Sequence, residues 1–192
     1  MKNIINPKIL LLLLSSVITV FVIMFVPAVS QDKAYHNFAD QRNIFGIPHF
    51  CNVVTNLPFL VVGLTGFFKI YKHELIGVLP DLFRAYLTFF LGLVLTGLGS
   101  WYYHLDPSNS TLVGDRMAIT VTFMSFFVLI FGESISTRTA LKLLVPLQFL
   151  GLASVAYWNI TENLGMGDLR FYALVQYLPI LLIPLMLLFY GS

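Results

Sequence analysis

The stretch Ala85–Tyr103 reads AYLTFFLGLVLTGLGSWYY and contains no Asp, Glu, Lys or Arg. An α-helix needs about 20 mainly apolar residues to cross the hydrocarbon core of a bilayer. The stretch therefore predicts a membrane-spanning helix, and the rest of the chain can be searched for segments of the same kind.

Five further runs lack these four residue types, and they are Ile9–Val29, Phe50–Phe68, Met117–Gly132, Leu143–Thr161 and Phe171–Ser192. None shows the period-two alternation of a transmembrane β-strand, so helices are favoured over a barrel. The run Met117–Gly132 is short, and we expect Arg116 to extend it by snorkelling to the interface. The prediction is an all-α, polytopic transmembrane helical bundle with six helices, at 9–29, 50–71, 84–104, 115–132, 141–161 and 170–191.

The composition supports the same class. Hydrophobic residues make up 58% of the chain and charged residues 10%, whereas soluble domains carry about 25% charged residues. This excludes an ordinary cytosolic enzyme and a disordered chain. The net charge of +2, without a basic run, indicates no nucleic-acid partner. Cys51 is the single cysteine, which excludes an internal disulfide and a Cys-rich zinc site.

The first run has two interpretations. Lys2 and Lys8 precede it and Ala28-Val29-Ser30 follows it, as in a secretory signal with a small-residue cleavage site. The apolar stretch is long for a signal, which favours an uncleaved anchor. We therefore divide the chain into an N-terminal anchor or signal-like helix at 1–30 and a membrane domain at 31–192.

The positions of Lys and Arg predict the orientation, because cytoplasmic loops carry more of them. With the N-terminus in the cytoplasm, the loops at 30–48, 104–116 and 162–170 are extracytoplasmic. The residues then inside are Lys2, Lys8, Lys69, Lys72, Arg84, Arg138 and Lys142. Those outside are the fewer Lys33, Arg42, Arg116 and Arg170.

The most informative polar residues are Ser100, His104 and Asp115. Ser100 and His104 are spaced i, i+4 and share a helix face, and Asp115 lies where the next helix is expected to begin. The three side chains can converge at one membrane depth on the extracytoplasmic side. A neutral imidazole can ligate zinc, a carboxylate can take a proton from water, and a hydroxyl can donate to an oxyanion.

A structural interpretation of the same residues stays open. His104 then bonds a backbone carbonyl, Asp115 caps a helix N-terminus, and the Ser100 hydroxyl bonds the carbonyl of residue 96. A Ser-His-Asp nucleophilic triad is disfavoured because the sequence has no nucleophile elbow.

Other polar residues have mainly structural interpretations. Asn52 and Asn56 share a face and are expected to join neighbouring helices. Asp168 is expected to cap the last helix and Arg170 to anchor it at the interface. Tyr172 and Gln176 share a face and are expected to line a cavity.

The sequence has no His-x-x-x-His pair, so the remaining histidines, His36, His49 and His73, are poor candidates for metal ligands.

Several motifs together resemble the alkaline ceramidase family, over residues 35–190. These are Asp40-Gln41-Arg42-Asn43-Ile44-Phe45-Gly46-Ile47-Pro48 leading into Asn52-Val53-Val54-Thr55-Asn56-Leu57-Pro58-Phe59, and Gly99-Ser100 through His104 followed by Asp115-Arg116-Met117. Gly167-Asp168-Leu169-Arg170 and Val175-Gln176-Tyr177-Leu178-Pro179 resemble the bacterial branch of the family. Adiponectin-receptor-like membrane hydrolases share the wider architecture.

The resemblance implies a seven-helix, zinc-dependent membrane hydrolase that cleaves the amide bond of ceramide, a sphingolipid, or of a related lipid amide. It implies His104 as a zinc ligand, Asp115 as the residue that activates or orients water, and Ser100 as the oxyanion stabiliser. It also implies the bacterial inner (plasma) membrane as the location, with ceramide or a similar membrane lipid as the binding partner.

The sequence departs from the family at one decisive place. The family's other two zinc ligands form a His-x-x-x-His pair on its last helix, and no histidine follows His104 here. The last two family helices are therefore expected to be missing. Three interpretations stay open: a fragment, an inactive descendant, or a chain whose partner supplies the pair. The helix faces that would contact the missing helices are expected to meet lipid or a partner, which predicts reduced stability or a homo-oligomer. A non-catalytic membrane protein, such as a lipid-binding or assembly subunit, is the alternative function.

Overall fold

The computed structural model describes residues 6–74 and 77–191. Lys2 and Ser192, which the sequence analysis mentions, lie outside this part of the chain. Within it the secondary structure is helical, and the only β-type pairing is an isolated bridge between Ile44 and Ile47.

The helices follow one another with short connections, except after the first. In chain order they are α1 (Pro7–Phe25), η1 (Lys33–His36), α2 (Phe50–Val54), α3 (Leu57–Tyr71), η2 (Pro80–Leu82), α4 (Phe83–Leu105), α5 (Asn109–Ser134), α6 (Thr137–Asn163) and α7 (Arg170–Tyr190). In the described part of the chain, six helical segments are long and apolar enough to cross a membrane. This confirms the prediction of an all-α polytopic bundle.

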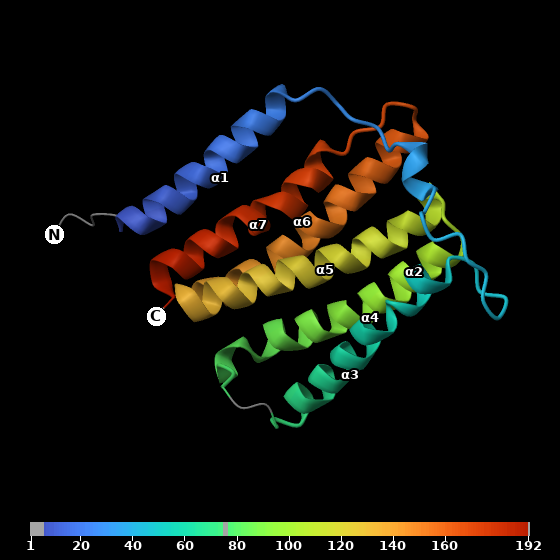
Figure 1. The fold of residues 1–192 in the computed structure, drawn as a ribbon. Helices are drawn as coiled ribbons and strands as arrows, with labels where there is room; N and C mark the ends of the chain where they lie inside the picture. Colours follow the sequence, from blue (N-terminus) through green and yellow to red (C-terminus); the bar gives the residue numbers. More distant parts are fainter. Residues whose placement is uncertain (1–5, 75–76, 192) are drawn as a thin grey trace.

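The long helices lie side by side, with their axes roughly aligned (Figure 1). α4 packs between α3 and α5, α5 also contacts α6 and α7, and α1 packs on α7. The start of α1 and the end of α7 lie at one end of the bundle, and the connection from α1 to α2 passes the opposite end (Figure 1). That opposite end contains the polar residues that the sequence analysis selected.

Several helix boundaries differ from the prediction, and two of these differences have local reasons. The span predicted at 50–71 is divided into α2 and α3, with Pro58 in the first turn of α3. Proline suits that position because the first N–H groups of a helix have no intrahelical partner. Asn56 donates its side-chain amide to the Asn52 carbonyl at 2.7 Å, within its own segment. The expectation that this amide joins a neighbouring helix is therefore wrong.

The helix predicted at 115–132 begins at Asn109, because Ser108 and Thr111 form a capping box. The Thr111 N–H donates to Ser108 Oγ at 3.2 Å, and the Ser108 N–H donates to Thr111 Oγ1 at 3.1 Å. Asp115 consequently lies inside α5, and the interpretation that it caps this helix is wrong. At the other end of the chain, α1 ends at Phe25 and the backbone continues in an extended conformation at Val26.

Glycines allow α4 and α5 to approach closely. A Cβ atom on Gly92 would lie 2.7 Å from Thr122 Oγ1 and 3.0 Å from the Thr122 Cα and N atoms. A Cβ atom on Gly99 would lie 3.1 Å from the Asp115 Cα atom. Small residues at such contacts let two membrane helices pack backbone to backbone. The residues beside them, including Ser100, can then reach the facing helix with short side chains.

We predict that Gly92→Ala destabilises the protein, because the Thr122 backbone would have to move. Overpacking of this kind costs about 1–3 kcal/mol. Gly114→Ala is the matched control, since Gly114 lies in α5, the partner helix of α4, but a Cβ there would meet nothing within 4 Å. That control should be neutral or stabilising, because Ala is favoured over Gly in helices by about 1 kcal/mol. Thermal unfolding in one detergent tests the pair, and equal shifts for both variants would contradict the close packing of α4 on α5.

Candidate functional site

Ser100 and Asp115 form a buried pair between α4 and α5. The Ser100 hydroxyl donates a hydrogen bond to Asp115 Oδ1. Ser100 is 8% exposed and Asp115 is 7% exposed. The structure thus brings together two of the three residues selected from the sequence. It also shows that the Ser100 hydroxyl bonds the facing helix and not the carbonyl of residue 96.

His104 lies one turn beyond Ser100, near the end of α4. Its Nδ1 atom is buried and has no hydrogen-bond partner among the described residues. The Phe38 ring packs edge-on against the imidazole, with 4.6 Å between ring centroids. Phe38 also packs edge-on against His49, at 5.1 Å. His104 is therefore held in an aromatic environment with one nitrogen atom unpaired.

The neighbouring histidines are already hydrogen-bonded. His36 Nδ1 lies 2.9 Å from the Tyr103 hydroxyl, and His36 Nε2 lies 2.9 Å from Asn109 Oδ1. His49 Nδ1 lies 2.7 Å from the Asp40 carbonyl oxygen. Over residues 6–74 and 77–191, no group of three His, Cys, Asp or Glu side chains is placed to hold a metal ion.

A cavity of about 310 Å³ adjoins the buried pair, between α5 and α7. Asp115 and Arg116 line it from α5, and Tyr172 and Gln176 line it from α7. Gln176 Nε2 donates to the Tyr172 hydroxyl at 3.2 Å. This confirms the expectation that Tyr172 and Gln176 share a face and line a cavity.

Arg116 does not snorkel to the membrane interface, and that expectation is wrong. The residue is 6% exposed. Its guanidinium carbon lies over the rings of Trp158, at 4.1 Å, and Tyr172, at 4.7 Å. Nη2 donates to Gln31 Oε1 at 2.6 Å, while the buried Nη1 has no partner in the described part of the chain. Aromatic faces and an amide oxygen replace water around the cation, so the side chain can stay inside the bundle.

Sequence reasoning missed this role for Arg116. The arginine was visible as a charged residue beside Asp115 at the edge of an apolar run. Its surroundings come from the segment after α1, from α6 and from α7, which are far apart in the sequence.

Asp168 and Arg170 form an ion pair at the same end of the bundle. Arg170 donates through Nε to Asp168 Oδ1 at 2.9 Å and through Nη2 to Asp168 Oδ2 at 2.7 Å. The Arg170 side chain holds the pKa of Asp168 at about 2, below its ordinary value. Asp168 also accepts the backbone N–H of Arg170 at 3.0 Å, so it satisfies one free N–H of the first turn of α7. Arg170 Nη1 donates to the Val26 carbonyl at 2.9 Å, which ties the end of α1 to α7.

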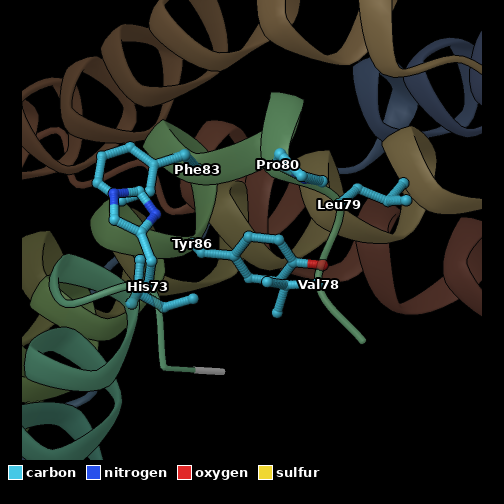
Figure 2. Close-up of a pocket in the computed structure, with 7 residues that line it drawn as sticks. His73, Val78, Leu79, Pro80, Phe83 and Tyr86 are labelled. Carbon is cyan, nitrogen blue, oxygen red and sulfur yellow. The ribbon is translucent and has the colours of Figure 1, made fainter. Parts of the chain in front are cut away.

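A second cavity, of about 180 Å³, lies between the end of α3 and the start of α4. Figure 2 shows His73, Phe83 and Tyr86 among its lining residues. The His73 and Phe83 rings stack with 5.1 Å between centroids, and Tyr86 donates a hydrogen bond to Glu133. These residues lie at the other end of α4 from Ser100, so this cavity is separate from the Ser100–Asp115 site.

The fold and the site together define a helical integral membrane protein with a polar centre buried between its spans. The model of the Ceramidase family matches residues 43–187. The chain therefore belongs to the ceramidase family, a family of hydrolases. No curated protein matches the chain, and no solved structure does. The matched region contains Ser100, His104, Asp115 and Arg116, while Gln31 precedes it.

A double-mutant cycle on Ser100→Ala and Asp115→Ala should give a coupling free energy of about 1–3 kcal/mol, as expected for a buried hydrogen bond to a carboxyl group. Each single variant leaves one buried polar group without its partner, and the double variant removes both. The matched control is the cycle on Thr96→Val and Thr122→Val, whose hydroxyl oxygens lie 2.9 Å apart between the same helices. That neutral pair should couple more weakly. The free energy of unfolding in mixed detergent micelles gives both values, and zero coupling for Ser100 and Asp115 would contradict the pair.

The Asp168–Arg170 pair predicts a loss of stability in acid. The folded pKa of Asp168 is about 2, and the unfolded value is about 3.9. A lowered folded pKa means that the contribution is complete above the unfolded pKa and is lost as the pH falls from about 4 to about 2. Asp168→Asn should reduce this part of the acid dependence of the melting temperature. An unchanged pH profile in the variant would contradict the assignment.

Proposed function

We propose that this protein is a ceramidase-like hydrolase that cleaves the amide bond of ceramide or a related lipid amide. Two observations support the proposal: the match to the ceramidase family and the buried Ser100–Asp115 pair one turn from His104. Buried polar groups within membrane spans are costly and usually serve a function. The bundle surrounds them with apolar helices, as a lipid substrate requires.

The proposed chemistry uses Asp115 as the general base and acid. Water attacks the amide carbonyl carbon while Asp115 accepts one of its protons, and Asp115 then returns this proton to the nitrogen as the C–N bond breaks. The products are a fatty acid and an amine. Ser100 first holds the carboxylate by its hydrogen bond, and its hydroxyl then donates to the oxyanion that forms on the carbonyl oxygen.

Zinc is the cofactor that family membership suggests, and His104 is the ligand that we propose for it. The described residues do not by themselves fit a catalytic zinc ion, which takes about three protein ligands. They offer the unpaired Nδ1 of His104 but no group of three suitable side chains. The proposed steps therefore use only the chain's own side chains, and we propose that a second copy of the chain supplies the missing ligands. We place the protein in a bacterial inner membrane with the N-terminus in the cytoplasm and the site on the extracytoplasmic side.

The second candidate is a non-catalytic membrane protein that binds lipid or serves as an assembly subunit. The observation that favours it is the same incomplete ligand set over residues 6–74 and 77–191. The two candidates share the fold and differ in whether the amide bond is cleaved.

We predict that the purified full chain hydrolyses a fluorescent N-acyl sphingoid substrate and that Asp115→Asn lowers the rate by about 10²-fold or more, since it removes the general base. His104→Ala should abolish hydrolysis and lower the bound zinc per chain. The matched control is His73→Ala, because His73 lies beside the other cavity and is not part of the proposed site.

The two measurements separate the candidates. Rates that fall in His104→Ala and Asp115→Asn but not in His73→Ala support the hydrolase. A folded wild-type protein with neither zinc nor hydrolysis would overturn it in favour of the non-catalytic candidate.

A further inference from the structure

We propose that the cavity between α5 and α7 binds the oxyanion headgroup of a long-chain amphiphile, a carboxylate or a phosphate, at Arg116. The proposal concerns binding and does not require hydrolysis, so it goes beyond the proposed function. Three features support the proposal. Arg116 has a buried charge without a carboxylate partner, it has a hydrogen-bond donor without an acceptor, and the cavity beside it reaches the lipid-facing surface.

The charge of Arg116 lacks a carboxylate partner. The two ion pairs in the described part of the chain join Asp40 to Arg42 and Asp168 to Arg170. Over residues 6–74 and 77–191, no Asp or Glu oxygen lies within 4.0 Å of the Arg116 guanidinium nitrogens, although Asp115 is next to Arg116 in the sequence. A buried charge is costly unless it is paired. An anion that entered the cavity would supply the missing pair.

The free donor is Nη1. It is buried without a partner, while Nη2 donates to Gln31. The guanidinium carbon lies over the rings of Trp158 and Tyr172, and these contacts leave Nη1 without an acceptor atom. Arginine held in this way presents a fixed set of donors that suits carboxylate and phosphate oxygens.

The cavity fits the head of an amphiphile. At about 30 Å³ for each water-sized group, its volume of about 310 Å³ holds a headgroup and the first carbons of a chain. Its walls include the apolar side chains of Leu112 and Ile119. Tyr177 and Ile180, which also line it, are 68% and 50% exposed on the outer surface of α7. An alkyl chain can therefore leave the cavity sideways into the bilayer while the headgroup stays at Arg116. A free inorganic anion would leave this apolar wall unused.

Equilibrium binding of radiolabelled palmitate to the full chain in detergent tests the proposal. Palmitate should bind the wild-type protein at least about tenfold more tightly than 1-hexadecanol, which has the same chain without the charge. Arg116→Gln should lose this preference, and Arg116→Lys should keep part of it. Arg138→Gln is the matched control, because it removes one positive charge from the first turn of α6, at the other end of the bundle, and it should bind like the wild type.

Trp158 reports where the chain binds. Trp101→Phe leaves Trp158 as the only tryptophan. We expect 2-bromopalmitate, whose bromine lies beside the carboxylate, to quench its fluorescence, and we expect this quenching to be lost when Arg116→Gln is added. Equal quenching in both proteins would overturn the placement of the headgroup at Arg116.

Competition distinguishes the sources of the oxyanion. Displacement of palmitate by 1-palmitoyl-lysophosphatidate, but not by inorganic phosphate, supports an amphiphile site that also accepts a phosphate headgroup. Displacement by inorganic phosphate alone would overturn the requirement for an alkyl chain. Equal affinity of the wild-type protein for palmitate and hexadecanol would overturn the proposal even if Arg116→Gln does not fold. Palmitate binding can succeed where the hydrolysis assay fails, so the two proposals can fail separately.

Discussion

The contact between α4 and α5 is the constraint on which the rest of the site depends. Backbone atoms of α5 lie so close to Gly92 and Gly99 that a Cβ atom at Gly92 would be 3.0 Å, and one at Gly99 3.1 Å, from the nearest of them. Because the backbones are this close, the short Ser100 side chain can reach Asp115 and satisfy its carboxyl group inside the bundle. In a bilayer the hydrophobic effect does not drive helices together. Packing of small residues and interhelical hydrogen bonds therefore hold a helix pair such as α4 and α5 together. The glycines thus determine both the packing and the polar centre.

Most polar residues in the described spans have partners within the protein, although buried atoms such as His104 Nδ1 and Arg116 Nη1 do not. Each needs a partner within the protein, because the hydrocarbon core supplies none. Ser100 pairs with Asp115, and Gln176 pairs with Tyr172. Arg116 differs from these pairs, because only aromatic rings and a single amide oxygen surround its full positive charge. Its environment is stable enough to keep the cation buried and incomplete enough to attract an anion, and these are the properties of a binding site.

The spans could be predicted from sequence because hydropathy is a local property, as Ala85–Tyr103 shows. The start of α5 also has a local sequence signal, the Ser108–Thr111 capping box. The hydropathy criterion missed it because few apolar residues precede Met117. The proximity of Ser100 and Asp115 could be predicted because only a short connection joins the two helices that carry them. The burial of Arg116 could not be predicted, because the partners that hold it come from three separate segments and meet only in the folded chain.

The connection between α1 and α2 does more than link two helices, because it covers the polar end of the bundle (Figure 1). The Gln31 N–H donates to Glu162 Oε2 at 3.0 Å, and its side chain accepts from Arg116. Phe38, further along the same segment, packs on His104. Both residues precede the matched region 43–187, yet each contacts a residue of the candidate site within it. The environment of this site is therefore set partly by residues that the family model does not include, and its ligand preference is a property of this chain as well as of the family.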